Sequence, residues 1–268
     1  MPERSIFLSH GAPSLILDDA PARRFLAGWG ASLGRPRAVV VASAHWLTRE
    51  PAVSAAPAPD TIHDFGGFDP KLYEMHYRAP GAPEVARRAA DLLGAAGFAA
   101  GIDPQRGMDH GAWCPLTLIY PAADIPVVSM SVQPNRDPAH HLAVGRALAP
   151  LLAEDVLVIG SGSTTHDLRR FRRQPIDTPE APDSRAFAEW LAQTLESGDV
   201  EALADVWRRG PHALANHPTP EHLLPFFVAL GAGGGIGRRV HASATYGMLA
   251  MDAFAFGTSD GESRRSAA

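Results

Sequence analysis

The stretch Ala38-Val39-Val40-Val41-Ala42-Ser43-Ala44-His45-Trp46 decides the fold class of this chain. Its continuous apolar run is rich in β-branched residues and is typical of a strand buried on both faces, because a half-exposed strand alternates apolar with polar residues. Such a strand lies inside a sheet that helices cover on each side. The run ends in small residues and His45, so the strand also delivers a side chain that can bind or react.

Two further apolar runs repeat this design. Ile6-Phe7-Leu8-Ser9 leads to His10, and Val156-Leu157-Val158-Ile159-Gly160 leads through a Ser/Gly/Thr turn to His166. Strands that alternate with helices predict an α/β fold with a mainly parallel sheet covered on both faces. We expect helices at 20–33, 83–96, 138–153, 182–197, 199–208 and 220–230, and further strands at 125–132 and 240–246.

The organisation along the chain favours a single domain. No repeat or linker divides the 268 residues, so we expect one catalytic domain over 1–257 and a flexible C-terminal tail over the small, polar residues 258–268. Residues 57–83 are rich in proline, glycine and aromatics and are too long for a simple turn. A loop of this kind often covers a binding site, and His63, Tyr73 and His76 in it are candidates to face a substrate.

Composition excludes several classes of partner. A net charge of −5 offers no basic excess for nucleic acid. No apolar run is long enough to span a membrane, and the N-terminal residues lack a signal-peptide pattern, so we expect a cytoplasmic protein. The single cysteine, Cys114, allows neither an intramolecular disulfide nor a thiolate metal cluster. The sequence is compatible with either a monomer or a homo-oligomer.

The histidines at the strand ends carry the chemistry. Ligands of open α/β sheets bind beyond the carboxyl ends of the strands, so His10, His45 and His166 are expected to converge there, with His222, around one divalent metal ion. Small residues before each of the three let the backbones approach closely. Any one of these histidines alone is more often a hydrogen-bonded structural residue, but three in equivalent positions favour a shared site.

The segment His217-Pro218-Thr219-Pro220-Glu221-His222 supplies the fourth element. Glu221 and His222 are expected in the first turn of the helix at 220–230, where a carboxylate also complements the helix dipole, so His222 is the favoured ligand and Glu221 the alternative. His217 precedes a proline in a loop and is a candidate for substrate binding or for support of a ligand. His110, which stands in Gly107-Met108-Asp109-His110-Gly111, either contacts a ligand or caps backbone groups.

These motifs occur together in a known order. The pattern resembles the class III extradiol ring-cleavage dioxygenases, and most closely their 4,5-DOPA dioxygenase extradiol branch, from His10 to about Phe256. It is carried by Ser9-His10-Gly11-Ala12-Pro13, Ser43-Ala44-His45-Trp46, Gly107–Gly111, Gly160–His166, His217–His222, Tyr246-Gly247-Met248 and Met251-Asp252.

The resemblance implies a three-layer α/β/α domain with a mixed central sheet. It also implies a metal bound by His10, His45 and His222, an acid/base histidine at His166 and a substrate-pocket histidine at His110. The third ligand in the wider superfamily is a glutamate, so the histidine expected here leaves Fe²⁺ and Zn²⁺ both open.

The activity implied is metal-dependent extradiol cleavage of a catechol-type, DOPA-like substrate with O₂. Two alternatives are a zinc-dependent hydrolase on the same fold and a non-catalytic metal-binding relative that binds peptides or proteins. The intact histidine set argues against the second, because a binding module does not need an open metal site.

Overall fold

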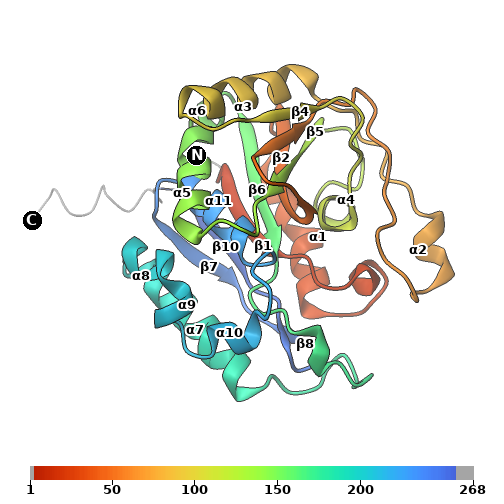
Figure 1. Cartoon of the computed structure of the whole chain (residues 1–268). Coiled ribbons are helices and arrows are strands. Elements are labelled where there is room, and N and C mark those ends of the chain that lie inside the picture. Colours follow the sequence, from red (N-terminus) through yellow and green to blue (C-terminus); the bar gives the residue numbers. More distant parts are fainter. Residues whose placement is uncertain (1–2, 258–268) are drawn as a thin grey trace, which may run out of the picture.

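A single eight-stranded sheet forms the centre of the molecule (Figure 1). The computed structural model describes residues 3–257, so the tail predicted at 258–268 lies outside the described residues. The strands run in the order β4-β3-β5-β2-β6-β1-β10-β7. Their bounds are β1 Ser5–Ser9, β2 Ala38–Leu47, β3 Ala52–Ser54, β4 Gly101–Asp103, β5 Val127–Val132, β6 Val156–Gly162, β7 Gly237–His241 and β10 Ala253–Phe256, with β8 Ala244–Thr245 and β9 Leu249–Ala250 in a separate pair.

The sheet is mixed, with a parallel centre. β5, β2, β6 and β1 run parallel to one another, whereas β3 is antiparallel to β5, β10 to β1, and β7 to β10. The expected mainly parallel, mixed sheet is therefore confirmed. The strand predicted at 240–246 is only partly correct, since β7 ends at His241 and the chain returns to the sheet as β10, a four-residue run too short to show periodicity.

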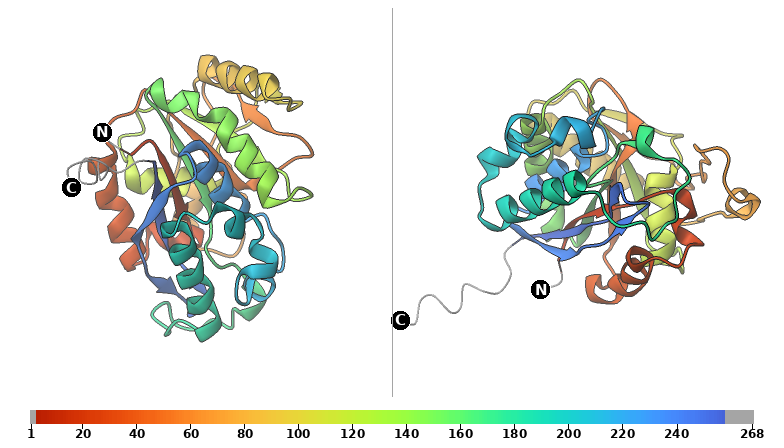
Figure 2. Two further views of the ribbon diagram at one scale, coloured as in Figure 1. Left: turned by 90° about the vertical axis from the view of Figure 1, so that its left-hand side faces the viewer. Right: turned by 90° about the horizontal axis from the view of Figure 1, so that it is seen from below.

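Helices cover both faces of the sheet (Figure 2). Ile6 and Leu8 of β1 pack into a core with α1 (Pro21–Leu33) and α4 (His110–Ile119), while Phe7 between them packs into the opposite core with α7 (Pro182–Glu196) and α11 (Leu224–Ala232). α3 (Pro83–Ala95) and α5 (Pro138–Leu148) extend that second layer. The shorter helices are η1 Pro13–Ile16, α2 Pro70–Glu74, α6 Pro150–Ala153, η2 Leu168–Arg170, α8 Val200–Ala204, α9 Val206–Arg209 and α10 Ala213–Asn216.

The helix predicted at 199–208 is two short helices, α8 and α9, which are divided at Asp205. Proline positions explain two further differences from the predicted helices. The helix predicted at 138–153 is divided into α5 and α6 at Pro150, which has no N–H to continue the hydrogen-bond ladder. The helix predicted from Pro220 begins at Leu224, with Pro225 in its first turn. Glu221 and His222 therefore lie in the turn before α11, a correction to their expected place inside the helix.

The strand register aligns the ends of three strands at one edge. Ser9 of β1 pairs with Gly162 of β6, and Ser43 of β2 pairs with Ser161. The turn that carries His222 lies against β6, because a Cβ on Gly162 would stand 2.0 Å from the His222 carbonyl oxygen. Segments far apart in sequence are thereby brought to one place. Within residues 3–257 we find no helix with the length and apolar character needed to cross a membrane.

Candidate active site

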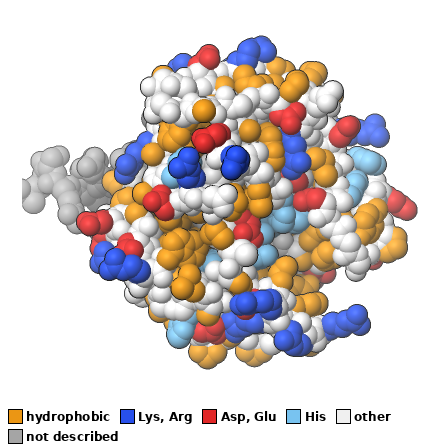
Figure 3. Space-filling model, viewed as in Figure 1, with side chains coloured by type: hydrophobic (Ala, Val, Ile, Leu, Met, Phe, Trp, Pro, Cys, Tyr) orange, Lys and Arg blue, Asp and Glu red, His pale blue; other side chains and the backbone are white. Residues whose placement is uncertain are grey.

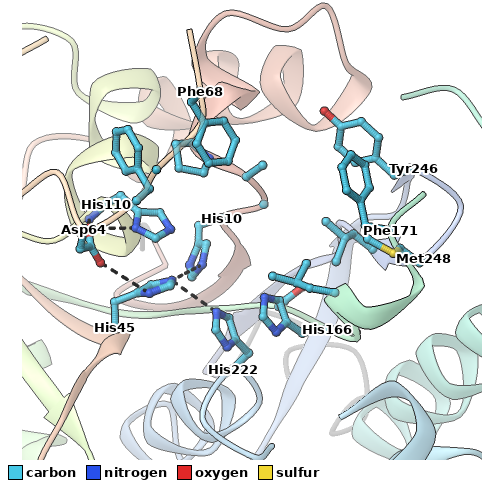
Figure 4. A pocket seen from close by; sticks show the side chains of 18 residues that line it. His10, His45, Asp64, Phe68, His110, His166, Phe171, His222, Tyr246 and Met248 are labelled. Atoms are coloured by element: carbon cyan, nitrogen blue, oxygen red, sulfur yellow. Dashed lines mark hydrogen bonds and ion pairs between the residues drawn. The ribbon is translucent and has the colours of Figure 1, made fainter. Parts of the chain in front are cut away.

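A cavity of about 500 Å³ opens at the carboxyl ends of β1, β2 and β6. Five histidines line it, and Figure 4 shows them gathered at one end, with Asp64 beside them. Figure 3 shows histidine side chains reaching the surface on this face, bordered by hydrophobic ones. The histidines and other hydrophilic residues that line the cavity are His10, His45, Asp64, His110, Ser163, His166 and His222.

Three of these histidines turn their Nε2 atoms toward one another. Nε2 of His45 lies 3.1 Å from that of His10 and 3.3 Å from that of His222. Imidazole nitrogens bound to one divalent ion at about 2.0–2.1 Å stand about 2.8–3.4 Å apart at octahedral or tetrahedral angles. The two separations match those values, and one ligand atom from each of the three side chains lies within 4.8 Å of the other two, so the cluster is a candidate metal site.

The Nδ1 atoms decide which nitrogen each ring offers. The Ser161 hydroxyl donates its one proton to the Gly111 carbonyl, so it must accept from His10 Nδ1, 3.0 Å away. Nδ1 of His222 donates to Glu221 Oε1 at 3.2 Å, and Nδ1 of His45 faces Asp64 Oδ2 at 3.6 Å. The Nδ1 atoms of His10 and His222 are thus hydrogen-bonded, and that of His45 faces a carboxylate, an arrangement that leaves the Nε2 atoms to bind a metal.

Burial keeps the three rings uncharged. It lowers the pKa values of His10 and His222 well below the ordinary range, and the neighbouring imidazoles lower them further. Burial likewise lowers the pKa of His45 to about 3, with His110 adding to the effect and Asp64 opposing it. Neutral imidazole is the form that binds a metal, so the electrostatics agree with the geometry.

Glu221 lies behind His222. Its Oε1 accepts hydrogen bonds from Thr219 Oγ1 at 2.8 Å and from His222 Nδ1. Oxygen and nitrogen atoms of His166, Glu221 and His222 do lie within 4.8 Å of one another, which makes a second candidate cluster. The engaged Oε1 fits a carboxylate that orients a ligand histidine better than a ligand itself.

Asp64 was missed in the sequence. One carboxylate oxygen accepts hydrogen bonds from the His110 backbone N–H and from its Nδ1, both at 2.9 Å. Hydrogen bonds and charge from His110 lower the pKa of Asp64 to about 2, against the effect of its partial burial. The sequence predicts that the 57–83 loop covers the site, and the signal for Asp64 within it is an acid directly before an aromatic residue and two glycines.

His166 lines the cavity beside the three-histidine cluster. Its ring stacks on that of His222, with centroids 3.4 Å apart and planes 9° from parallel. Its backbone N–H donates to the Asn216 carbonyl, which fixes the turn after β6. Burial lowers the pKa of His166 to about 4, so the ring is neutral at physiological pH and able to accept a proton.

His217 is placed differently from the expectation. It does not line the cavity; its Nε2 donates to the Thr164 carbonyl at 2.8 Å, and its ring packs against Phe187 and Trp207. These contacts tie the ring of His217 to the turn before His166 and to α7 and α9. In the 57–83 loop, the lining residues are Asp64, Phe65, Gly66 and Phe68 rather than His63, Tyr73 and His76.

Comparison with known proteins now identifies the family. Residues 6–255 match the family described as the catalytic LigB subunit of aromatic ring-opening dioxygenase. The chain belongs to the LigB family. The resemblance seen in the sequence motifs is thus confirmed, and this LigB-family protein is an oxidoreductase, an extradiol ring-cleaving dioxygenase.

Relatives and a solved structure agree with this assignment. The LigB-family chain is 42% identical over 260 residues to the 4,5-DOPA dioxygenase extradiol of Beta vulgaris, covering 95% of this chain and 96% of that one. It is 40% identical to the enzyme of the same name from Escherichia coli K12, covering 85% and 84%. The crystal structure of an uncharacterised Escherichia coli K12 protein matches with a TM-score of 0.79 and 34% identity, covering 94% of this chain and 98% of that one.

Proposed function

We propose that this enzyme opens the ring of a catechol with O₂, at a bond outside the two hydroxyl groups, using one divalent metal ion held by His10, His45 and His222. The convergence of the three Nε2 atoms, with the Nδ1 atoms of His10 and His222 hydrogen-bonded and that of His45 facing Asp64, carries the proposal. When bound, the ion would lower the pKa of a catechol hydroxyl and bring substrate and O₂ together. We favour Fe²⁺, because Zn²⁺ suits the same three imidazoles but has no redox chemistry.

His166 is proposed as the acid/base residue. It borders the ligand cluster, its ring is neutral, and the stack on His222 holds the ring in place. A neutral imidazole can take the proton that a catechol hydroxyl loses and return it later in the reaction. The stacking also explains how His166 can stand at the site without being a ligand.

His110 is proposed to hold the substrate. Its Nδ1 donates to Asp64, which leaves Nε2 for a hydrogen bond to a catechol oxygen. Its ring centroid lies 3.8 Å from that of His45 and 5.5 Å from that of His10, so a group bound at the ligand cluster comes within its reach.

Aerobic incubation of Fe²⁺-loaded protein with a panel of catechols, DOPA included, tests the activity. We expect a yellow ring-opened product together with O₂ uptake. Absence of both with every catechol, or hydrolysis of esters by the Zn²⁺ form without O₂ uptake, would contradict the proposal and favour a hydrolase.

Two variants separate the proposed roles. His166→Ala should retain the metal and lose at least about 100-fold in turnover, which is the lower range for a removed acid/base group. His222→Ala should lose the metal itself, as measured by elemental analysis after gel filtration. Metal lost from His166→Ala would make His166 a ligand, and metal retained by His222→Ala but lost from Glu221→Gln would make Glu221 the third ligand.

A further inference from the structure

We infer that the preferred substrate of this enzyme is a catechol with an uncharged, largely apolar substituent rather than one with an amino-acid tail. The inference rests on the proposed catechol cleavage and concerns the part of the cavity farthest from the histidines. It is carried by the size of the cavity and by the side chains of its outer walls.

The cavity has room for more than the ring. A cavity of about 150 Å³ is enough to hold benzene, whereas this one measures about 500 Å³. With the catechol hydroxyls at the histidines, the ring points its substituent toward the opposite end. Figure 4 shows Phe171, Tyr246 and Met248 at that end, across the cavity from Phe68.

The outer walls are apolar. Phe65, Phe68, Leu168, Phe171 and Met248 all line the cavity, and Figure 4 shows Phe68 on one side with Phe171 and Met248 on the other. Leu168 is 56% exposed and Phe171 43% exposed, so a substituent lying on them would remove apolar surface from water. The hydroxyl of Tyr246 is directed to Asp18, at 3.4 Å, which leaves its ring as the part of the residue that lines the cavity.

The walls offer no free counter-charge. Among the residues described at 3–257, those that line the cavity include no lysine and no arginine, and Asp64 is their only carboxylate. Asp64 already accepts two hydrogen bonds from His110 and faces His45. The carboxylate of an amino-acid tail therefore has no lysine or arginine in the cavity lining to pair with. The one lining carboxylate, Asp64, lies among the histidines rather than beside Phe171 and Tyr246, where the tail would lie (Figure 4).

Three of the four arginines that lie next to Leu168 and Phe171 in the sequence are held by other groups. Arg169 pairs with Asp167 at 2.7 Å, and Arg170 makes two hydrogen bonds to Asp183 at 2.8 and 3.0 Å. Arg172 donates to backbone carbonyls of its own segment. Moving a charged tail from water to an apolar wall without a partner weakens binding, whereas an alkyl tail gains from the same move.

A size-matched series of catechols tests the inference. Its members are 4-propylcatechol, 3-(3,4-dihydroxyphenyl)propanoate, dopamine and DOPA, which present neutral, anionic, cationic and zwitterionic tails. We expect kcat/KM of the Fe²⁺-loaded enzyme for 4-propylcatechol to exceed that for each charged member by at least about tenfold, equivalent to about 1.4 kcal/mol. An equal or higher kcat/KM for DOPA or for the propanoate would overturn the inference.

Anaerobic calorimetry with the same four compounds separates the two proposals. If the neutral compound binds tightest but none is turned over when O₂ is admitted, the inference on the tail stands and the proposed ring cleavage fails. If ring cleavage occurs without a preference for the neutral tail, the reverse holds. Absence of binding by all four contradicts both.

Phe171→Arg tests the wall directly. Placing a cation there should raise the ratio of kcat/KM for the propanoate over 4-propylcatechol by about tenfold. The matched control is Leu214→Arg, which adds the same charge on α10 at a side chain that is 67% exposed and outside the cavity lining. An unchanged ratio in Phe171→Arg, or the same rise in the control, would show that this wall does not contact the substituent.

Discussion

The acceptor behind each imidazole determines what the site can bind. A histidine can present either ring nitrogen, and the choice follows the hydrogen bond that the other nitrogen makes. Here a serine hydroxyl, a glutamate and an aspartate accept from, or face, the Nδ1 atoms of His10, His222 and His45. Three Nε2 lone pairs brought together repel one another unless a cation lies between them. The supporting acceptors are therefore as much a part of the candidate metal site as the ligands.

Asp64 joins the proposed substrate-binding residue to a proposed ligand, so its charge should matter to turnover. Asp64→Asn keeps the size of the side chain but weakens its hold on His110 and His45. We expect kcat at saturating Fe²⁺ to fall about 10- to 100-fold, the usual cost of removing a group that supports a metal site. Initial rates of product formation, with the metal content measured in the same sample, check this.

Asp60→Asn is the matched control, since Asp60 is an exposed aspartate in the same loop. It should leave kcat unchanged. A kcat of Asp64→Asn equal to that of the wild type, at equal metal content, would show that Asp64 has no such role.

His141 should make the fold sensitive to acid. It is fully buried, its Nδ1 donates to the Asp137 carbonyl, and its Nε2 accepts from the Gln133 backbone N–H. Burial lowers the pKa of His141 to about 4 from 6.5, so the folded state binds fewer protons than the unfolded state between these values. The stabilisation is complete above about pH 6.5 and is lost as the pH falls toward 4.

Urea unfolding of the wild type and of His141→Gln at several pH values between 4 and 7 measures this effect. The unfolding free energy of the variant should fall less steeply with acid than that of the wild type. His212→Gln, at an exposed histidine, should keep the wild-type slope. Equal slopes for wild type and His141→Gln would refute the prediction.

At the level of elements, close backbone contact along β6 positions the turn before α11. Gly160 and Gly162 allow this contact, since a Cβ would lie 2.1 Å from the Pro225 carbonyl oxygen and 2.0 Å from that of His222. The sequence analysis predicts that small residues before the strand-end histidines, here Gly160 and Gly162 before His166, allow backbones to approach closely. It could not predict that His222 precedes its helix, because Pro220 and Pro225 are equally good residues for a first helical turn.

Gly162→Ala should therefore disturb the site through the backbone. The added methyl group must push the His222 turn away from β6, at a cost of about 1–3 kcal/mol in unfolding free energy, and should weaken metal binding. Gly94→Ala is the control: Gly94 lies in α3 with no atom within 4 Å of the added Cβ, and the change should stabilise by up to about 1 kcal/mol. Thermal unfolding and metal titration of both variants check this; undiminished metal affinity in Gly162→Ala would contradict it.

At the level of the whole molecule, the sequence predicted the layers and the strand-end histidines but not every neighbour. Buried apolar runs reveal strands because burial on both faces leaves a continuous pattern of apolar residues. The sequence therefore predicts β1, β2 and β6 together with the histidines that follow them. Long-range contacts leave no such pattern. Asp64 reaches His110 across 46 residues, and His217 looks like a pocket residue in sequence but turns toward Phe187 in the fold.

Metal binding should stabilise the entire fold. His10, His45 and His222 come from the two ends of the sequence, and one ion bound only by the folded state would join these segments. At a free metal concentration about 100 times Kd the gain is about 2.7 kcal/mol, which raises Tm by roughly 5–10 °C for a chain of this size. Thermal unfolding with Fe²⁺ under anaerobic conditions, with Zn²⁺ and with a chelator measures this rise in Tm.

His222→Gln should show no rise in Tm with metal, because two imidazoles bind far more weakly than three, whereas Glu221→Gln should retain most of the rise. Equal Tm values for the metal-loaded and chelated wild type would contradict a metal site at these three histidines.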